Sequence, residues 1–179
     1  KLSNGITQLA KARNVQVLQG LATFVSSAQL LITSINSQQT LTFENCIIAT
    51  GSRAAGIPGT PADHPRIINS TGALKLQNIP KRLLVIGGGY IGLEMGSVYN
   101  ALGSQVTVVE FMPNLLPGAD EDLVKPLASK LKKSFENIYL STKVSKVEPN
   151  DNEVTVHFEG TGGKEFSETF DTVLVSVGR

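Results

Sequence analysis

The spacing of hydrophobic and polar residues changes along the chain, and the change falls near residue 65. Before it, apolar residues recur at helical spacing over one short stretch and then in brief runs typical of β-strands. After it, short continuous apolar runs alternate with amphipathic stretches long enough for helices. The two patterns predict two parts with different architectures.

The first part is predicted to contain one helix followed by short strands. The helix starts at Leu2 and ends at Asn14. Four β-like runs follow, at residues 15–18, 22–25, 30–35 and 40–43. Residues 36–38 supply a hairpin turn between the last two runs. A further apolar run at 47–50 ends at Gly51, which predicts a buried strand that meets a tight turn.

The second part is predicted to follow the order β-α-β-α-β between Leu83 and Val147, with a β-meander and a closing strand behind it. The expected strands are 83–86, 106–109, 142–147, 154–158, 166–170 and 173–177, and the expected helices are 90–102 and 120–135. Three acidic residues, Asp120 to Asp122, begin the second helix, where negative charge is favoured by the helix dipole. Residues 160–163, rich in glycine, make the turn within the meander.

A Gly-x-Gly-x-x-Gly pattern occupies Gly87, Gly88, Gly89, Tyr90, Ile91 and Gly92. It follows a predicted strand directly and opens a predicted helix directly, as a dinucleotide-binding turn requires. Gly96 repeats Gly92 on the same helix face, which allows the helix to pack closely on the sheet. Glu110 ends the second strand at about the 20-residue spacing that the dinucleotide fingerprint needs.

Dinucleotide binding explains why each of these residue types is needed at its position. Gly87 makes the tight turn, and Gly89 leaves room for a pyrophosphate to approach the backbone N–H groups at the helix start. Glu110 can accept hydrogen bonds from both hydroxyls of the adenosine ribose, whereas a 2′-phosphate would face its negative charge. Residues 111–117 contain no Arg or Lys to receive such a phosphate, so NAD(H) is predicted rather than NADP(H). The alternative is that the glycines serve only packing and that Glu110 is a surface charge.

These patterns predict an α/β protein with a Rossmann-like, dinucleotide-binding fold, in which helices flank a parallel sheet and an antiparallel β-meander is added. Residues 66–179 are expected to form the NAD-binding domain, and residues 1–65 a separate segment and linker. The linker is placed at 58–65, which is rich in Gly, Pro, Thr and Asp.

Charge and composition narrow the expected partners. The 179 residues include 16 basic and 15 acidic side chains, a net charge of +1, so neither nucleic acid nor an anionic membrane is expected as a partner. Lys130, Lys132 and Lys133 are assigned to the solvated face of a helix. No apolar run reaches the roughly 18 residues that span a bilayer.

The single cysteine, Cys46, excludes an internal disulfide and favours a cytoplasmic location. Since Cys46 begins an apolar run and has no basic neighbour, a buried structural role is predicted for it. His64 and His157 are isolated in sequence, and no Cys, His or Asp spacing suggests a metal site.

The sequence resembles the dihydrolipoamide dehydrogenases, which are flavoproteins of the FAD- and NAD-linked disulfide oxidoreductase family. The likeness lies in residues 83–96, 102–110, 47–53 and 173–179 and extends over essentially the whole chain. Such enzymes also carry an N-terminal FAD fingerprint, a redox cysteine pair and a C-terminal dimerisation domain, none of which is found in this sequence. The resemblance therefore implies a central piece of a longer protein, in which residues 1–65 are part of the FAD domain.

The resemblance also implies roles for single residues. NAD would contact Gly87 to Gly92, Glu94, Glu110, Val144 and Gly178, and Tyr90 would cover the nicotinamide pocket. Packing of Tyr90 on the sheet is the alternative. FAD would contact Gly20, Thr50, Gly51 and Ser52, but only together with the missing part of its domain. No catalytic residue is expected within this chain.

The activity implied for the parent protein is oxidation of dihydrolipoamide to lipoamide through a cysteine pair and FAD, with hydride passing to NAD⁺. Its partner would be dihydrolipoamide on the lipoyl domain of a 2-oxo-acid dehydrogenase complex, and the full-length protein would be a homodimer. The chain alone would bind NAD(H) without catalysis. One alternative stays open, that the parent is a sister flavoenzyme such as an NADH oxidase, an NADH peroxidase or a soluble transhydrogenase.

Overall fold

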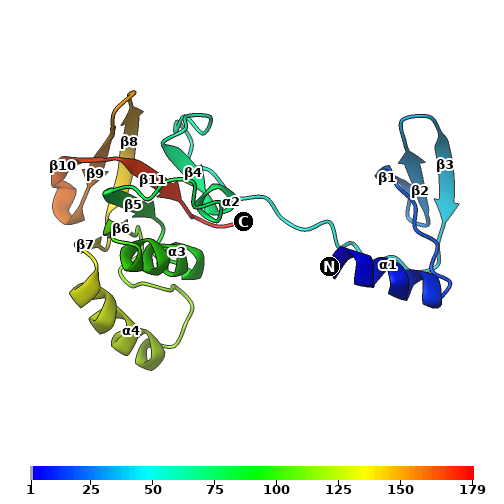
Figure 1. Ribbon diagram of the computed structural model, residues 1–179, viewed down its shortest axis with the longest axis horizontal. Coiled ribbons are helices and arrows are strands. Elements are labelled where there is room, and N and C mark those ends of the chain that lie inside the picture. Colours follow the sequence, from blue (N-terminus) through cyan, green and yellow to red (C-terminus); the bar gives the residue numbers. More distant parts are fainter. Residues whose placement is uncertain (1) are drawn as a thin grey trace. The chain divides into compact units, whose positions relative to one another are not determined.

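The computed structural model describes residues 2–179, which fall into two compact units. The first unit ends at Gly51, and the second spans Ser52–Arg179. Figure 1 shows the helices and strands of both units, coloured along the sequence. Within residues 2–179, no helix has the length and apolar character needed to cross a membrane.

The first unit consists of one helix and a three-stranded antiparallel sheet (Figure 1). These elements are α1 (Leu2–Ala12), β1 (Leu21–Ser26), β2 (Gln29–Thr33) and β3 (Gln38–Thr42), with the sheet order β1-β2-β3. Helix α1 ends as predicted, because Asn14 adopts a φ of 53°, a left-handed conformation that asparagine tolerates better than most residues. The predicted hairpin between β2 and β3 is also present.

Three predictions in the first unit are wrong. Residues 15–18 and 47–50 are not strands, and the side chains of Ile47 and Ile48 are 91% and 69% exposed. Cys46 is exposed rather than buried. The physical reason is that an apolar run becomes a strand only when another strand pairs with its backbone, and within the described residues of this unit nothing pairs with 47–50.

Five parallel strands form the central sheet of the second unit, in the order β4-β11-β5-β6-β7. They are β4 (Ile67–Asn69), β5 (Arg82–Ile86), β6 (Gln105–Val109), β7 (Asn137–Tyr139) and β11 (Thr172–Val175). The helices are α2 (Ser70–Ala73), α3 (Tyr90–Ala101) and α4 (Glu121–Ser134). This arrangement confirms the predicted Rossmann-like α/β fold.

The meander lies on the sheet as a second, antiparallel layer. Its strands are β8 (Lys143–Pro149), β9 (Val154–Glu159) and β10 (Glu165–Phe170), and the short turn η1 (Thr161–Gly163) joins the last two. Side chains along β5 alternate between the two faces of the sheet. Leu83 and Val85 belong to the core that contains residues of α3 and α4, whereas Leu84 and Ile86 belong to the core under the meander. Because both faces are covered, β5 reads as a continuous apolar run.

Two details of the predicted order need correction. The third parallel strand is the short β7, and residues 142–147 belong mainly to β8, the first strand of the meander. Strand β4 and helix α2, with three and four residues, were not predicted, since elements this short show no periodicity.

Residues 52–65, predicted to precede the NAD-binding domain, are part of the second compact unit. The N–H of Ala55 donates to the carbonyl of Gly178 over 2.9 Å. Ile57 packs against the core under the meander. The domain division at residue 65 therefore stays a prediction for the longer protein, and in this chain the linker residues help to build the second unit.

Candidate dinucleotide-binding site

The glycine turn between β5 and α3 is shaped by close backbone contacts. Gly87 adopts a φ of 107°, and a Cβ there would lie 2.5 Å from the carbonyl oxygen of Ser176. A Cβ on Gly92 would collide with the carbonyl oxygen of Gly87. Gly89, the N-cap of α3, has no atom within 4 Å of its absent side chain. Two glycines thus allow the helix to pack tightly, and the third leaves its backbone open.

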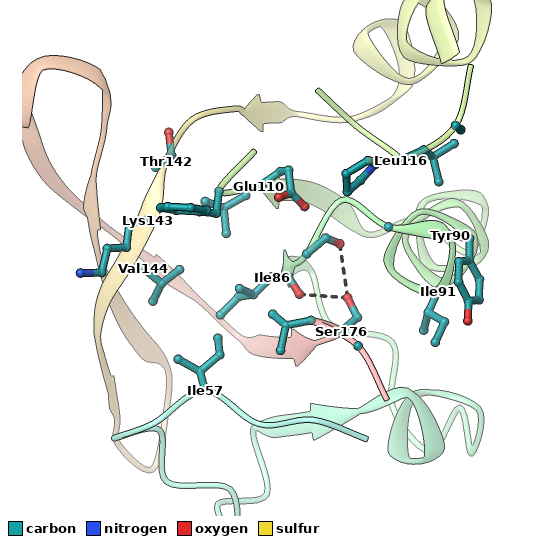
Figure 2. Close-up of a pocket in the computed structure, with 18 residues that line it drawn as sticks. Ile57, Ile86, Tyr90, Ile91, Glu110, Leu116, Thr142, Lys143, Val144 and Ser176 are labelled. Atoms are coloured by element: carbon teal, nitrogen blue, oxygen red, sulfur yellow. Dashed lines mark hydrogen bonds between the residues drawn. The ribbon is translucent and has the colours of Figure 1, made fainter. Parts of the chain in front are cut away.

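A pocket of about 810 Å³ opens beside this turn, at the carboxyl ends of β5, β6 and β11 (Figure 2). The chain leaves β5 toward β6 on one side, while β11 and β4 lie on the other, so the pocket sits where the strand order reverses. Such a switch point is where open α/β sheets bind ligands. The volume falls within the range of small-molecule and cofactor sites.

Glu110, at the end of β6, is only 8% exposed and its carboxylate is held by the main chain. The N–H of Gly88 donates to Oε2 over 2.6 Å, and the N–H of Met112 donates to Oε1 over 2.7 Å. A carboxylate offers about four lone-pair positions. Two are used by these amides, so one acceptor position on each oxygen remains for a donor in the pocket. A vicinal diol supplies two such donors.

The N-terminus of α3 provides the second polar feature of the pocket. Gly89 caps the helix without any side-chain hydrogen bond, so no side chain of the protein covers the first-turn N–H groups at the cap. Such groups, together with the helix dipole, form a ready site for phosphate. Tyr90 and Ile91, the first two residues of the helix, both line the pocket, and the Tyr90 side chain is 66% exposed.

The structure brings seven of the predicted NAD-contacting residues to the wall of one pocket: Gly87, Gly89, Tyr90, Ile91, Glu110, Val144 and Gly178. Gly88 and Gly92 lie behind that wall, where they serve Glu110 and the helix packing. Glu94 is exposed and does not line the pocket. Its predicted contact with NAD is therefore not supported by this geometry.

The residues assigned to FAD lie outside this pocket. Gly20, Thr50 and Gly51 belong to the first unit, and a Cβ on Gly20 would lie 2.7 Å from the carbonyl oxygen of Thr33. Close packing between neighbouring backbones thus accounts for Gly20 without a cofactor. Ser52 belongs to the second unit, where its hydroxyl accepts a hydrogen bond of 2.8 Å from Nε of Arg179.

Several lining residues were not found from the sequence: Ile57, Ile86, Val109, Phe111, Leu116, Pro117, Ala119, Thr142, Lys143, Ser176 and Val177. Lys143 is the cationic member, and it comes from β8, outside residues 111–117, which contain no Arg or Lys. Figure 2 shows its ammonium directed away from Glu110. Ser176 has a backbone role, since its hydroxyl donates to the carbonyl of Ile86 over 2.9 Å. Its position two residues before Gly178, a predicted site residue, is the sequence feature by which Ser176 could have been identified.

Two phenols of the second unit, the buried Tyr99 and the half-buried Tyr139, donate hydrogen bonds within the protein. Burial raises the pKa of Tyr99, whose hydroxyl donates to the carbonyl of Ala73 over 2.9 Å. Burial, followed by the hydrogen bond to Glu168 and the negative charge of that residue, raises the pKa of Tyr139 to about 12. Neither residue lines the pocket, and both phenols stay protonated at neutral pH.

A surface ion cluster on the meander uses one of the two histidines. Glu148 lies between Lys146 and His157, with its oxygens 2.7 and 2.6 Å from the two nitrogens. Hydrogen bonds from Lys146 and then from His157 lower the pKa of Glu148. His157 is therefore not isolated in space, although it is isolated in sequence.

Known proteins match this chain over its whole length. Residues 1–179 match the family described as pyridine nucleotide-disulphide oxidoreductase. A dihydrolipoyl dehydrogenase from Haemophilus influenzae is 46% identical over 180 residues, covering 100% of this chain and 37% of that protein. One from Vibrio parahaemolyticus is 41% identical over 179 residues, covering 100% of this chain and 38% of that protein.

Among solved structures, the HOCl-induced flavoprotein disulfide reductase RclA from Escherichia coli, as its Cu(II) complex, is similar with a TM-score of 0.83. It is 29% identical in sequence, and the match covers 99% of this chain and 39% of that one. The chain thus spans less than two fifths of the length of these relatives. The resemblance to dihydrolipoamide dehydrogenases is confirmed, and the chain belongs to the pyridine nucleotide-disulphide oxidoreductase family.

Proposed function

We propose that this chain is the NAD-binding portion of a flavoprotein that oxidises dihydrolipoamide to lipoamide and reduces NAD⁺. The observation that carries the proposal is the Glu110 carboxylate, which is fixed at the pocket wall with two acceptor positions free. They match the two hydroxyls of an adenosine ribose. The names of the bacterial relatives support the choice of dihydrolipoamide as the substrate of the longer protein.

Different residues of the pocket are proposed to bind different parts of the dinucleotide. In this proposal the N–H groups at the start of α3 hold the pyrophosphate, and Gly89 lets it approach the backbone. Glu110 holds the adenosine ribose, and Val144 lies beside the adenine. Gly178 and Tyr90 lie beside the nicotinamide half. The Tyr90 ring is exposed, so it can move without disturbing a packed core.

The redox chemistry is assigned to the rest of the longer protein. A flavin and a cysteine pair would supply electron transfer there, and this chain would hold the nicotinamide in position. Gly20, Thr50, Gly51 and Ser52 are proposed to contact FAD in that complete protein. The homodimer, the cytoplasmic location and the lipoyl-domain partner are likewise proposals for it.

Glu110→Ala in the chain tests the binding role. The variant removes the acceptor of both ribose hydroxyls, so we expect its free energy of NADH binding to weaken by about 1–3 kcal/mol. NADPH should lose much less, because its 2′-phosphate gains when the negative charge is removed. Isothermal titration calorimetry with both nucleotides measures the two affinities.

Glu94→Ala is the matched control, since it removes an equal side chain that is exposed and outside the pocket. It should leave both affinities unchanged. If wild-type chain bound NADH and NADPH equally, the role given to Glu110 would be wrong. Assays of the complete protein with dihydrolipoamide, molecular oxygen or hydrogen peroxide as the second substrate separate the dehydrogenase from the oxidase and peroxidase alternatives.

A further inference from the structure

The loop between β6 and α4 separates two cavities. On one side it borders the dinucleotide pocket, and on the other a hollow of about 400 Å³ between the loop and α4. Leu116, Pro117 and Ala119 line both spaces. Leu115 lines only the hollow behind the loop, so it has no direct access to a ligand in the pocket.

Leu115 nevertheless packs against the glycine turn. Its side chain is 3% exposed, and its Cδ2 lies 2.7 Å from the position that a Cβ on Gly88 would take. A side chain at Gly88 would therefore clash with Leu115, whose methyl group occupies the space beside the Gly88 backbone. Gly88 is not one of the fixed glycines of the Gly-x-Gly-x-x-Gly pattern, and this contact explains the absence of a side chain there.

Leu116 joins the loop to the glycine turn by a hydrogen bond. Its N–H donates to the carbonyl of Gly88 over 2.9 Å, and its own carbonyl accepts from Ala119 over 3.0 Å. Leu116 has a φ of 50°, a left-handed conformation that is costly for a bulky residue. Such a conformation persists only where neighbouring contacts hold it, and the buried side chain of Leu115 is the adjacent anchor.

Gly88 connects this loop to the Glu110 carboxylate. The carbonyl of Gly88 accepts from the loop, and its N–H donates to Oε2 of Glu110. Oε1 of Glu110 accepts from Met112, the start of the same loop. The direction in which the free lone pairs of Glu110 point is thus set by two amides. The loop supplies one of them, and it is hydrogen-bonded to Gly88, the residue that supplies the other.

We infer that Leu115 is a positioning residue for nucleotide selectivity, acting through Gly88 to orient Glu110 toward the 2′- and 3′-hydroxyls of the adenosine ribose. The inference rests on the proposed NAD-binding function. A 2′-phosphate cannot donate to the carboxylate and is repelled by its charge, so NADPH, which keeps only the 3′-hydroxyl as a donor, gains less from this orientation. Loss of Leu115 should therefore weaken NADH binding and spare NADPH binding, which lowers the selectivity ratio.

Leu115→Ala in the chain tests this, with Leu131→Ala as the matched control. Leu131 is 4% exposed in the same core, but it lies in α4 and lines neither space. Both variants create a cavity, whereas only one touches Gly88. Calorimetric titrations with NADH and NADPH should show an NADH dissociation constant raised about tenfold in Leu115→Ala, with NADPH changed less than about twofold. Leu131→Ala should keep the wild-type ratio.

An unchanged ratio in Leu115→Ala, with wild-type preference for NADH intact, overturns the inference and leaves the proposed function standing. No preference for NADH in the wild type overturns the proposed function itself. If circular dichroism shows that Leu115→Ala does not fold, Leu115→Val replaces it, because it removes less volume. The ratio should then fall in the same direction by a smaller factor, and a ratio equal to the wild type would again refute the role of Leu115.

Discussion

Both compact units contain short apolar runs, but the second unit buries these side chains and the first leaves most of them exposed. In the second unit, both faces of the parallel sheet are covered, and β5 is buried almost completely. In the first unit, Ile32 is the only hydrophobic residue among those described that is buried, and β1 exposes Leu21 by 73% and Phe24 by 51%. Strand formation thus requires only a pairing neighbour, whereas a core requires a second layer.

The difference bears on stability. Burial of apolar surface is the main favourable contribution to folding, and it must exceed the conformational entropy of the chain. The second unit has two cores that share one sheet, so we expect it to meet this requirement by itself. The first unit has strands and a helix without a comparable core among its described residues.

Dividing the chain should produce the largest effect. We expect residues 52–179 alone to unfold in one cooperative transition, because both cores are retained. Residues 1–51 alone should show no cooperative transition, since their sheet covers almost no apolar surface. Thermal melts followed by circular dichroism compare the two pieces. A sharp transition in the shorter piece would contradict the contrast between the units.

Phe158→Ala should destabilise the second unit by about 3–5 kcal/mol, the usual cost of truncating a buried phenylalanine. Phe158 is 1% exposed in β9, and its ring stacks on Phe166 with 4.9 Å between centroids. Phe24→Ala, in the first unit, is the matched control and should leave unfolding of the second unit unchanged. Urea denaturation gives both free energies, and equal losses would show that the units are coupled in stability.

A smaller effect is expected from Tyr139 at alkaline pH. Its pKa is raised from 10.0 to about 12 in the folded protein, first by burial and then by Glu168. The protonated phenol is therefore favoured by folding. Its contribution to stability is fully present below pH 10 and is lost as the pH rises toward 12.

Glu168→Gln removes the negative charge beside Tyr139 and should lower its pKa toward the ordinary value. Tyr139→Phe should make the stability of the second unit less sensitive to pH in the same range. Absorbance of the phenolate during an alkaline titration measures the first effect, and urea denaturation at several pH values measures the second. A phenolate that forms at the same pH in wild type and Glu168→Gln would exclude the role of Glu168.

Much of the site could be predicted because its chemistry is local in sequence. The turn at Gly87–Gly92 is set by steric limits on a strand that passes directly into a helix, and a carboxylate at the end of the next parallel strand must lie at the same edge of the sheet. The glycine motif identifies the turn, and Glu110 is the carboxylate at the end of the next strand. The lining residues Ile57, Lys143 and Ser176 come from segments far apart in the chain, so no local pattern identified them.

The amino-acid sequence by itself determined the Rossmann-like order of elements, the glycine turn and the placement of Glu110, because periodicity and glycine stereochemistry act between near neighbours. The tertiary structure decided which apolar runs become buried. It left Ile47 and Cys46 exposed, and it made β7 rather than 142–147 the third parallel strand. It also bound the Glu110 carboxylate to the amides of Gly88 and Met112. Burial and pairing depend on partners distant in sequence, and only the folded chain brings them together.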